Sequence, residues 1–110
     1  TLPDGYVYDH QMYDSVTVVN ILDVDGELAA TGRIAFPGEL AVYDRISTHE
    51  NHRRKGLARS IMKRLESISH ARGIRRAALV ATPDGRALYE PLGWQLHSLY
   101  TTAVIPKPDP

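Results

Sequence analysis

The chain has 110 residues, which is enough for one domain, and its 43% hydrophobic and 24% charged residues are typical of a globular protein. It contains no cysteine, which excludes disulfide bonds, thiolate metal sites and cysteine nucleophiles. No apolar run reaches the roughly 18 residues of a membrane span, and residues 1–14 show no targeting signal. We therefore expect one domain over residues 1–110, a cytoplasmic location and no membrane partner.

The formal net charge is zero, but the charge is unevenly distributed along the chain. Residues 49–76 contain nine basic and two acidic residues, so this segment carries +7 and the remainder −7. Such a concentration indicates an anionic partner at a defined place, although a solvated helix face is an alternative explanation. Nucleic acid is a weaker candidate, because no aromatic residues are interleaved with the arginines.

The first half of the chain predicts an antiparallel meander. Residues 1–14 have no helical periodicity, and we expect them to be an extended or irregular lead-in. Residues 15–24 are rich in valine and isoleucine, and the turn dipeptides Asp25-Gly26 and Pro37-Gly38 separate them from two further segments. The predicted strands cover residues 15–24, 27–36 and 39–48.

The second half begins with a helical pattern, because apolar residues recur every three or four positions over residues 54–72. Gly73 is expected to end this helix, and a short buried strand follows at 74–81. The order strand, helix, strand predicts that the strands around residues 44 and 78 are parallel. The remaining expected elements are a short helix at 82–90, one bent strand or a short pair at 94–105, and a tail at 106–110. The predicted fold class is α+β with a mixed, mostly antiparallel sheet.

The most basic point of the chain lies where a strand leads into the long helix, at residues 53–58. The first amides of a helix have no intrahelical partner, and the helix dipole adds partial positive charge there. Glycine at position 56 allows close approach to the backbone. The segment is therefore expected to hold a phosphate or a diphosphate. It matches neither a P-loop nor a G-x-G-x-x-G motif.

The spacing Arg53-x-x-Gly56-x-Ala58 resembles the [QR]-x-x-G-x-[GA] coenzyme A signature of the GNAT N-acetyltransferase superfamily. A second block at residues 87–94, ALYEPLGW, is similar to the family's A-x-x-L-Y-x-x-x-G-F stretch, with tryptophan in place of phenylalanine. Two motifs at the family's separation are more specific than either alone. The resemblance covers residues 15–105, and it implies a splayed pair of parallel strands with acetyl-CoA or coenzyme A between them.

The resemblance also implies roles for individual residues. The open strand edge that pairs with pantetheine would be Ile46, Ser47 and Thr48, and Tyr89 would be the general acid that protonates the leaving thiolate. Thr82 stands where the family often has an asparagine that contacts coenzyme A. The remaining cofactor-binding residues implied by the resemblance would hold the diphosphate, and they are Arg53, Arg54, Lys55, Gly56, Leu57, Ala58 and Arg59.

Asp44 is the candidate general base, because it shares a strand face with Val42, where some family members carry a glutamate. A salt bridge from Asp44 to an arginine, or a water relay in place of a base, are the alternatives. His49 and His52 are close in sequence, but no third ligand falls at a recognised spacing, and we expect no metal.

The function implied by the resemblance is transfer of an acetyl or short acyl group from coenzyme A to a primary amine by direct attack. The alternative is a GNAT-like acyl-CoA-binding or regulatory module without catalysis of its own. Family members usually begin with a strand and two helices that form a wall on the acceptor side, and only 14 residues precede the hairpin here. We therefore expect a preceding N-terminal domain, or a second copy in a homodimer, to complete the site for a small-molecule or peptide amine.

Overall fold

The computed structural model describes residues 2–80, 94–98 and 103–106. The described residues form strands, one single-turn 3₁₀ helix (η1) and one long α-helix (α1). Their bounds are β1 (Val7–Tyr13), β2 (Val16–Leu22), β3 (Leu28–Ala35), β4 (Leu40–Thr48), η1 (Glu50–His52), α1 (Leu57–Ala71), β5 (Arg76–Val80), β6 (Trp94–Ser98) and β7 (Ala103–Pro106).

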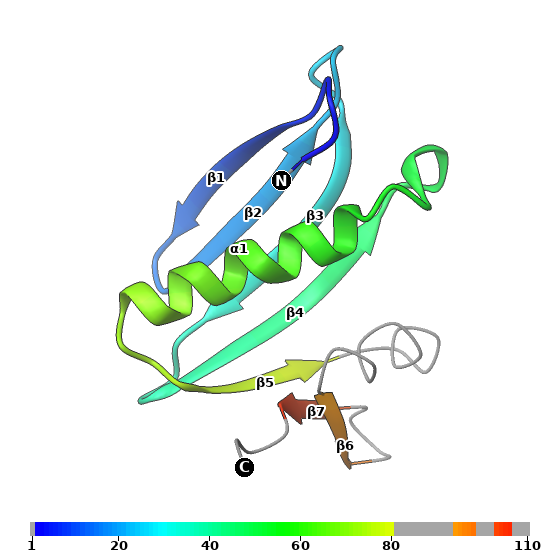
Figure 1. Cartoon of the computed structure of the whole chain (residues 1–110). Helices are drawn as coiled ribbons and strands as arrows, with labels where there is room; N and C mark the ends of the chain where they lie inside the picture. Colours follow the sequence, from blue (N-terminus) through cyan, green and yellow to red (C-terminus); the bar gives the residue numbers. More distant parts are fainter. Residues whose placement is uncertain (1, 81–93, 99–102, 107–110) are drawn as a thin grey trace.

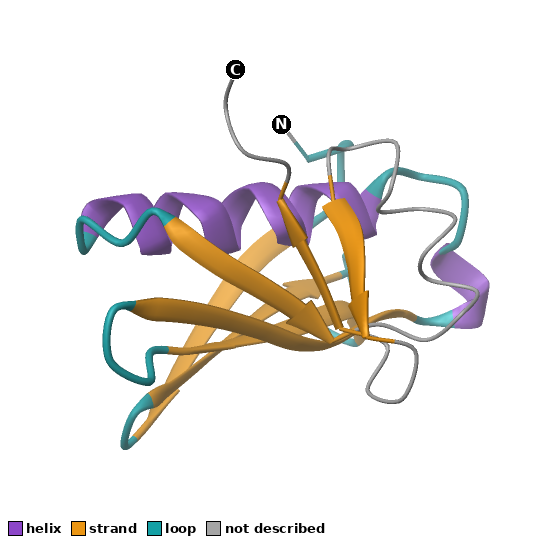
Figure 2. Ribbon diagram, turned by 90° about the horizontal axis from the view of Figure 1, so that it is seen from below, coloured by secondary structure: helices purple, strands orange, loops and turns teal. Residues whose placement is uncertain are grey.

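The strands form one sheet in the order β1-β2-β3-β4-β5-β7-β6. Strands β1 to β4 pair as an antiparallel meander, β4 and β5 are parallel, and β7 pairs antiparallel with both β5 and β6. Helix α1 lies across one face of the sheet, so the described residues form two layers (Figures 1 and 2). The predicted α+β class, the meander and the parallel crossover pair are confirmed.

Residues 1–14 were expected to be extended or irregular, and residues 7–13 are extended, because they form β1 along the full length of β2. The Tyr8 hydroxyl donates a hydrogen bond to the Ser60 carbonyl at 3.2 Å, and the Arg64 guanidinium lies 3.9 Å above the Tyr8 ring. These contacts with α1 stabilise a strand whose own sequence has few β-branched residues. A strand thus precedes the hairpin, and only Asp14 and Ser15 separate it from β2.

Helix α1 begins at Leu57, three residues later than the periodicity predicted. Arg54 and Gly56 have φ angles of 65° and 73°, and these left-handed conformations are incompatible with a right-handed helix. The other end agrees with the prediction, because Gly73 has a φ of 72° and its amide donates to the His70 carbonyl at 2.9 Å.

The hydrophobic core lies between α1 and strands β2 to β5. Gly32 of β3 marks the closest approach of the two layers, because a Cβ atom there would lie 2.5 Å from Ile61 Cγ2. The buried side chains of α1 are Leu57, Ile61, Met62, Leu65 and Ser69. The apolar face that predicted this helix is therefore the face that covers the sheet.

The C-terminal part contains the antiparallel pair β6 and β7, which decides between the two alternatives left open for residues 94–105. Strand β7 includes Pro106, which was expected in the tail. The predicted short helix at 82–90, together with Thr82 and Tyr89, lies outside the described residues.

Candidate functional site

The parallel pair separates partway along β4. Pairing with β5 runs from Leu40–Arg76 to Tyr43–Leu79, whereas β4 continues to Thr48. Within the described residues, the second half of β4 is therefore paired on one side only, by β3. Ile46, Ser47 and Thr48 lie in this one-sided stretch, which is where the open edge was predicted.

A β-bulge lies at the point of separation. Thr31 pairs with Ser47 and Arg33 with Asp44, so Gly32 alone faces both Arg45 and Ile46. Arg45 has a φ of 52°, which is unusual for a residue with a side chain. Bulges bend the strand that contains them and often re-aim groups beside functional sites. The bend therefore accompanies the change from a β4 paired on both sides to a one-sided edge.

The loop from β4 to α1 places the basic residues beside this edge. It is attached to the sheet by the His49 amide, which donates to the Ala29 carbonyl at 2.7 Å. Beyond η1, the exposed side chains of Arg53, Arg54 and Lys55 have no ion-pair partner among the described residues. Three unneutralised cations thus lie next to the start of α1.

The start of α1 has no side-chain cap. Gly56 occupies the N-cap position, and its carbonyl accepts hydrogen bonds from the amide and the hydroxyl of Ser60 at 3.0 and 3.1 Å. The first-turn amides, those of Leu57, Ala58 and Arg59, have no acceptor within the helix. Uncapped amides, the positive end of the helix dipole and three cations together match the requirements of a diphosphate.

Gly56 is required by its backbone conformation rather than by crowding. Apart from its chain neighbours, no described residue has an atom within 4 Å of the position that its Cβ would occupy, whereas its φ of 73° is one that residues with side chains rarely adopt. Arg54 has a similar φ of 65° two residues earlier. Left-handed non-glycine residues cost about 1–2 kcal/mol, and they tend to occur at functional sites. Both Arg45 and Arg54 lie beside the candidate site.

A model of the GNAT acetyltransferase family matches residues 2–94. The chain belongs to the GNAT acetyltransferase family. Members of this family use acetyl-CoA as the acyl donor, so the group expected at the basic loop is coenzyme A. A search of curated proteins found no match.

Solved structures with the same fold confirm the GNAT architecture. A candidate acetyltransferase from Exiguobacterium has a TM-score of 0.73 at 15% identity, covering 87% of this chain and 65% of its own. The PaiA N-acetyltransferase from Thermoplasma acidophilum, solved with coenzyme A, has a TM-score of 0.72 at 15% identity and 83% and 58% coverage. The ribosomal-protein-S18-alanine N-acetyltransferase from Escherichia coli has a TM-score of 0.67 at 20% identity and 86% and 68% coverage. The GNAT chain thus spans less than two thirds of the length of the Exiguobacterium protein and of the Thermoplasma protein.

Asp44 of the GNAT chain forms a two-point ion pair with Arg33. Arg33 Nε and a terminal guanidinium nitrogen donate to the two carboxylate oxygens at 3.2 and 2.9 Å. Hydrogen bonding to Asp44 raises the pKa of the Arg33 guanidinium above its ordinary value. The side chains are about one third exposed. The ion pair is thus present, and the role of Asp44 as a base stays a prediction.

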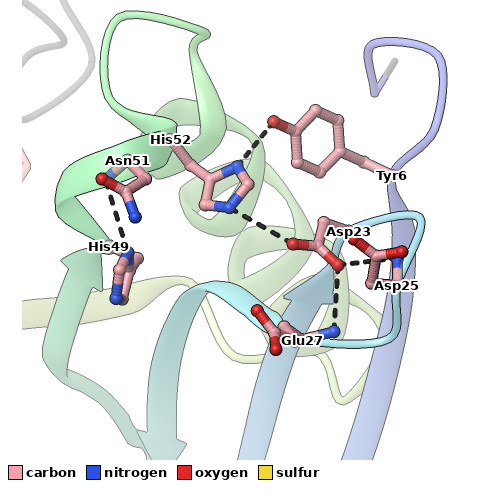
Figure 3. Close-up of polar contacts among 7 residues, drawn as sticks. All are labelled: Tyr6, Asp23, Asp25, Glu27, His49, Asn51 and His52. Carbon is pink, nitrogen blue, oxygen red and sulfur yellow. Dashed lines mark hydrogen bonds and ion pairs between the residues drawn. The ribbon is translucent and has the colours of Figure 1, made fainter.

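His52 lies between two partners far away in the sequence rather than in a metal site (Figure 3). Its Nδ1 atom is 2.8 Å from the Tyr6 hydroxyl, and its Nε2 atom is 3.4 Å from an Asp23 carboxylate oxygen. No group of His, Asp and Glu in the described part of the chain is arranged to hold a metal ion. Residues 6, 23 and 52 share no local pattern, so the sequence alone did not predict this cluster.

No helix among the described residues is long and apolar enough to cross a membrane.

Proposed function

We propose that this GNAT chain transfers an acetyl or short acyl group from coenzyme A to a primary amine by direct attack. The observation that carries the proposal is the uncapped start of α1, with a left-handed glycine and three cations that have no ion-pair partner in the described part of the chain, next to the one-sided edge of β4. Coenzyme A, when bound, supplies the acyl group as an activated thioester. The residues of the chain bind this donor, orient it and move protons.

The two halves of the site would bind two different parts of the donor. Backbone groups of Ile46, Ser47 and Thr48, which form an edge without a strand partner on the β5 side in the described residues, would pair with the pantetheine amides. The amides of residues 57–59 would hold the diphosphate, and Arg53, Arg54 and Lys55 would neutralise it. Together they would fix the acyl carbon beside the point where β4 and β5 separate.

The reaction needs two proton transfers, one to the departing thiolate and one from the attacking amine. Tyr89 would donate its phenolic proton to the departing thiolate, and Thr82 would contact coenzyme A nearby, as the family motifs predict. Each oxygen of the Asp44 carboxylate accepts one hydrogen bond from Arg33, and each keeps a second lone pair that could accept the amine proton. Loss of the amine proton through a water molecule would leave the pair intact.

The acceptor would be an amine of a small molecule or a peptide. Structural relatives include an enzyme named for the alanine of a ribosomal protein, which supports an amine acceptor without identifying it. The one-sided edge and the basic loop would also suit an acyl-CoA-binding module that does not catalyse, so binding and turnover need separate measurements.

Binding is tested by calorimetry with acetyl-CoA on the wild-type chain and on Gly56→Glu. The substitution places a carboxylate where the diphosphate would lie and strains a left-handed position, so affinity should fall at least tenfold, about 1.4 kcal/mol. Gly38→Glu is the matched control, because Gly38 also has a positive φ, of 67°, and no described residue other than its chain neighbours lies within 4 Å of its Cβ position. Lack of binding by the wild type, or equal losses in both variants, would contradict the assignment.

Turnover is tested by supplying acetyl-CoA with a panel of primary amines and measuring the free thiol released. The chain contains no cysteine, so protein thiols contribute no background. Amine-dependent thiol release by the wild type supports the acyltransferase. Tight binding without release for any amine in the panel would favour the non-catalytic module instead.

A further inference from the structure

The basic loop is held by contacts on both sides of its cationic segment. On the N-terminal side, the His52 amide donates to the His49 carbonyl at 2.9 Å, and the His49 ring accepts from the Asn51 amide at 3.3 Å. On the C-terminal side, Leu57 is buried in the core. Between these points, residues 53–55 are exposed. The side chain of His52 is thus the last anchor before the residues that would contact the diphosphate.

The His52 side chain connects this loop to two other segments. The Tyr6 ring belongs to the segment before β1, and it meets the imidazole edge-on at a centroid distance of 5.6 Å. Asp23 belongs to the β2–β3 hairpin, where its second oxygen accepts from the amides of Asp25 and Glu27 at 2.9 and 3.0 Å. Figure 3 shows the imidazole between these two partners. The Asp23 carboxylate is itself fixed by the hairpin, so it provides a rigid attachment.

Both ring nitrogens of His52 lie next to a polar partner. Nδ1 forms a hydrogen bond with the Tyr6 hydroxyl at 2.8 Å, and Nε2 lies 3.4 Å from an Asp23 carboxylate oxygen. The side chains of His52 and Asp23 are only 19% and 13% exposed, which limits competition from water. A ring with a partner at each nitrogen has one preferred orientation, and therefore fixes the backbone from which Arg53 follows.

We infer that the cluster of Tyr6, His52 and Asp23 is a positioning device that pre-orders the coenzyme A loop of this chain. The inference rests on the proposed function, since it assigns the cluster to the affinity for that donor. A loop ordered before binding avoids the conformational entropy cost of ordering at binding. Release of His52 should therefore weaken acyl-CoA binding without affecting the groups that react.

Kinetics with acetyl-CoA test this role on His52→Ala and Tyr6→Phe. We expect His52→Ala to raise the KM for acetyl-CoA about tenfold with kcat changed less than twofold, and Tyr6→Phe to raise it a few fold. Tyr6→Phe keeps the ring and removes only the hydroxyl, so it retains the packing if His52→Ala folds poorly. His52→Gln should restore part of the affinity, because its amide nitrogen can donate to Asp23 in place of Nε2. His70→Ala, at an exposed position in the last turn of α1, is the control.

Hydrogen exchange of the free protein gives a second readout that needs no ligand. In His52→Ala, the amides of residues 50–59 should exchange faster, while those of β2 and β3 stay protected. If exchange in the loop and the KM for acetyl-CoA are both unchanged, or if kcat falls with KM constant, the positioning role is wrong. If the wild type binds no acetyl-CoA, the proposed function fails and this inference fails with it. Normal wild-type binding with an unaffected His52→Ala overturns the inference alone.

Discussion

Tyr43 is a buried phenol in the core, with 2% of its surface exposed. Burial raises its pKa to about 12, because the phenolate would lose its hydration, while a hydrogen bond with Ser69 acts in the opposite direction. The same group in an unfolded chain has a pKa of about 10. The folded and unfolded states therefore differ in the protonation of Tyr43 only at alkaline pH.

The sign of the resulting pH dependence follows from these two values. Below pH 10 both states keep the proton, and the stability contribution is fully present. Between about pH 10 and 12 the unfolded state loses its proton first, so the free energy of unfolding should fall by up to about 1.4 kcal/mol per pH unit. Urea denaturation between pH 9 and 11.5 should show a steeper loss for the wild type than for Tyr43→Phe. The exposed Tyr13→Phe should follow the wild type, and parallel curves for all three proteins would contradict the assignment.

The sequence allowed a salt bridge from Asp44 to an arginine without identifying Arg33, and it did not predict the partners of His52, because these partners are distant along the chain. Asp44 pairs with Arg33 across two strands, and His52 joins residues 46 and 29 positions away. Neither pairing has a periodic signature, because it depends on strand register and loop placement rather than on local spacing. By contrast, the position of the cations at 53–55 and of Gly56 beside the start of the long helix was predicted, since a helix start next to a basic run is a local pattern.

At the scale of elements, α1 and β3 pack closely because position 32 of β3 is a glycine, which leaves room for the Ile61 side chain. The Cβ of an alanine at position 32 would lie 2.5 Å from Ile61 Cγ2, 3.2 Å from Ile46 Cγ1 and 3.4 Å from Leu65 Cδ1. Ile61 and Leu65 are fully buried, so they have little space into which to move. Gly32 also lies opposite the β4 bulge, so the same contact supports the bend of the strand edge.

Gly32→Ala should therefore destabilise the fold by about 1–3 kcal/mol, as overpacked core substitutions do. Thermal unfolding should show a melting temperature lower by several degrees. Ile61→Ala removes the methyl group that clashes and by itself costs about 2–5 kcal/mol. In the double variant the alanine at 32 should cost less than it does in the wild type. An equal cost in both backgrounds would show that the two residues do not interact.

The elements that the sequence predicted well are those with strong local signals. Valine-rich strands, turn dipeptides and a long amphipathic helix led to the meander and to α1. Strand β1 was missed because its stability comes from pairing with β2 and from the contacts of Tyr8 with α1. The start of α1 was placed too early because apolar periodicity does not register the left-handed residues Arg54 and Gly56.

At the scale of the whole molecule, the +7 segment of residues 49–76 runs along α1 from one end to the other. The helix has 15 residues, and at a rise of 1.5 Å per residue it separates the two ends by roughly 22 Å. The Debye length is about 10 Å at 0.1 M salt, so the arginines beyond the C-terminal end are screened from the N-terminal end. We therefore expect that only cations near the N-terminal end of α1 assist donor binding.

Arg53→Ala and Arg75→Ala test this expectation, because each removes one exposed arginine, so the two variants have the same net charge as each other. In 0.1 M NaCl, Arg53→Ala should weaken acetyl-CoA binding about three- to tenfold through loss of a charge-assisted contact, whereas Arg75→Ala should change it less than twofold. At 1 M NaCl the Debye length is about 3 Å, so the electrostatic part of the Arg53 effect should shrink while binding weakens in every protein. Calorimetry at both salt concentrations measures these differences. Equal losses for the two variants at 0.1 M would mean that the net charge of the molecule attracts the donor, and that the start of α1 is not where its phosphates bind.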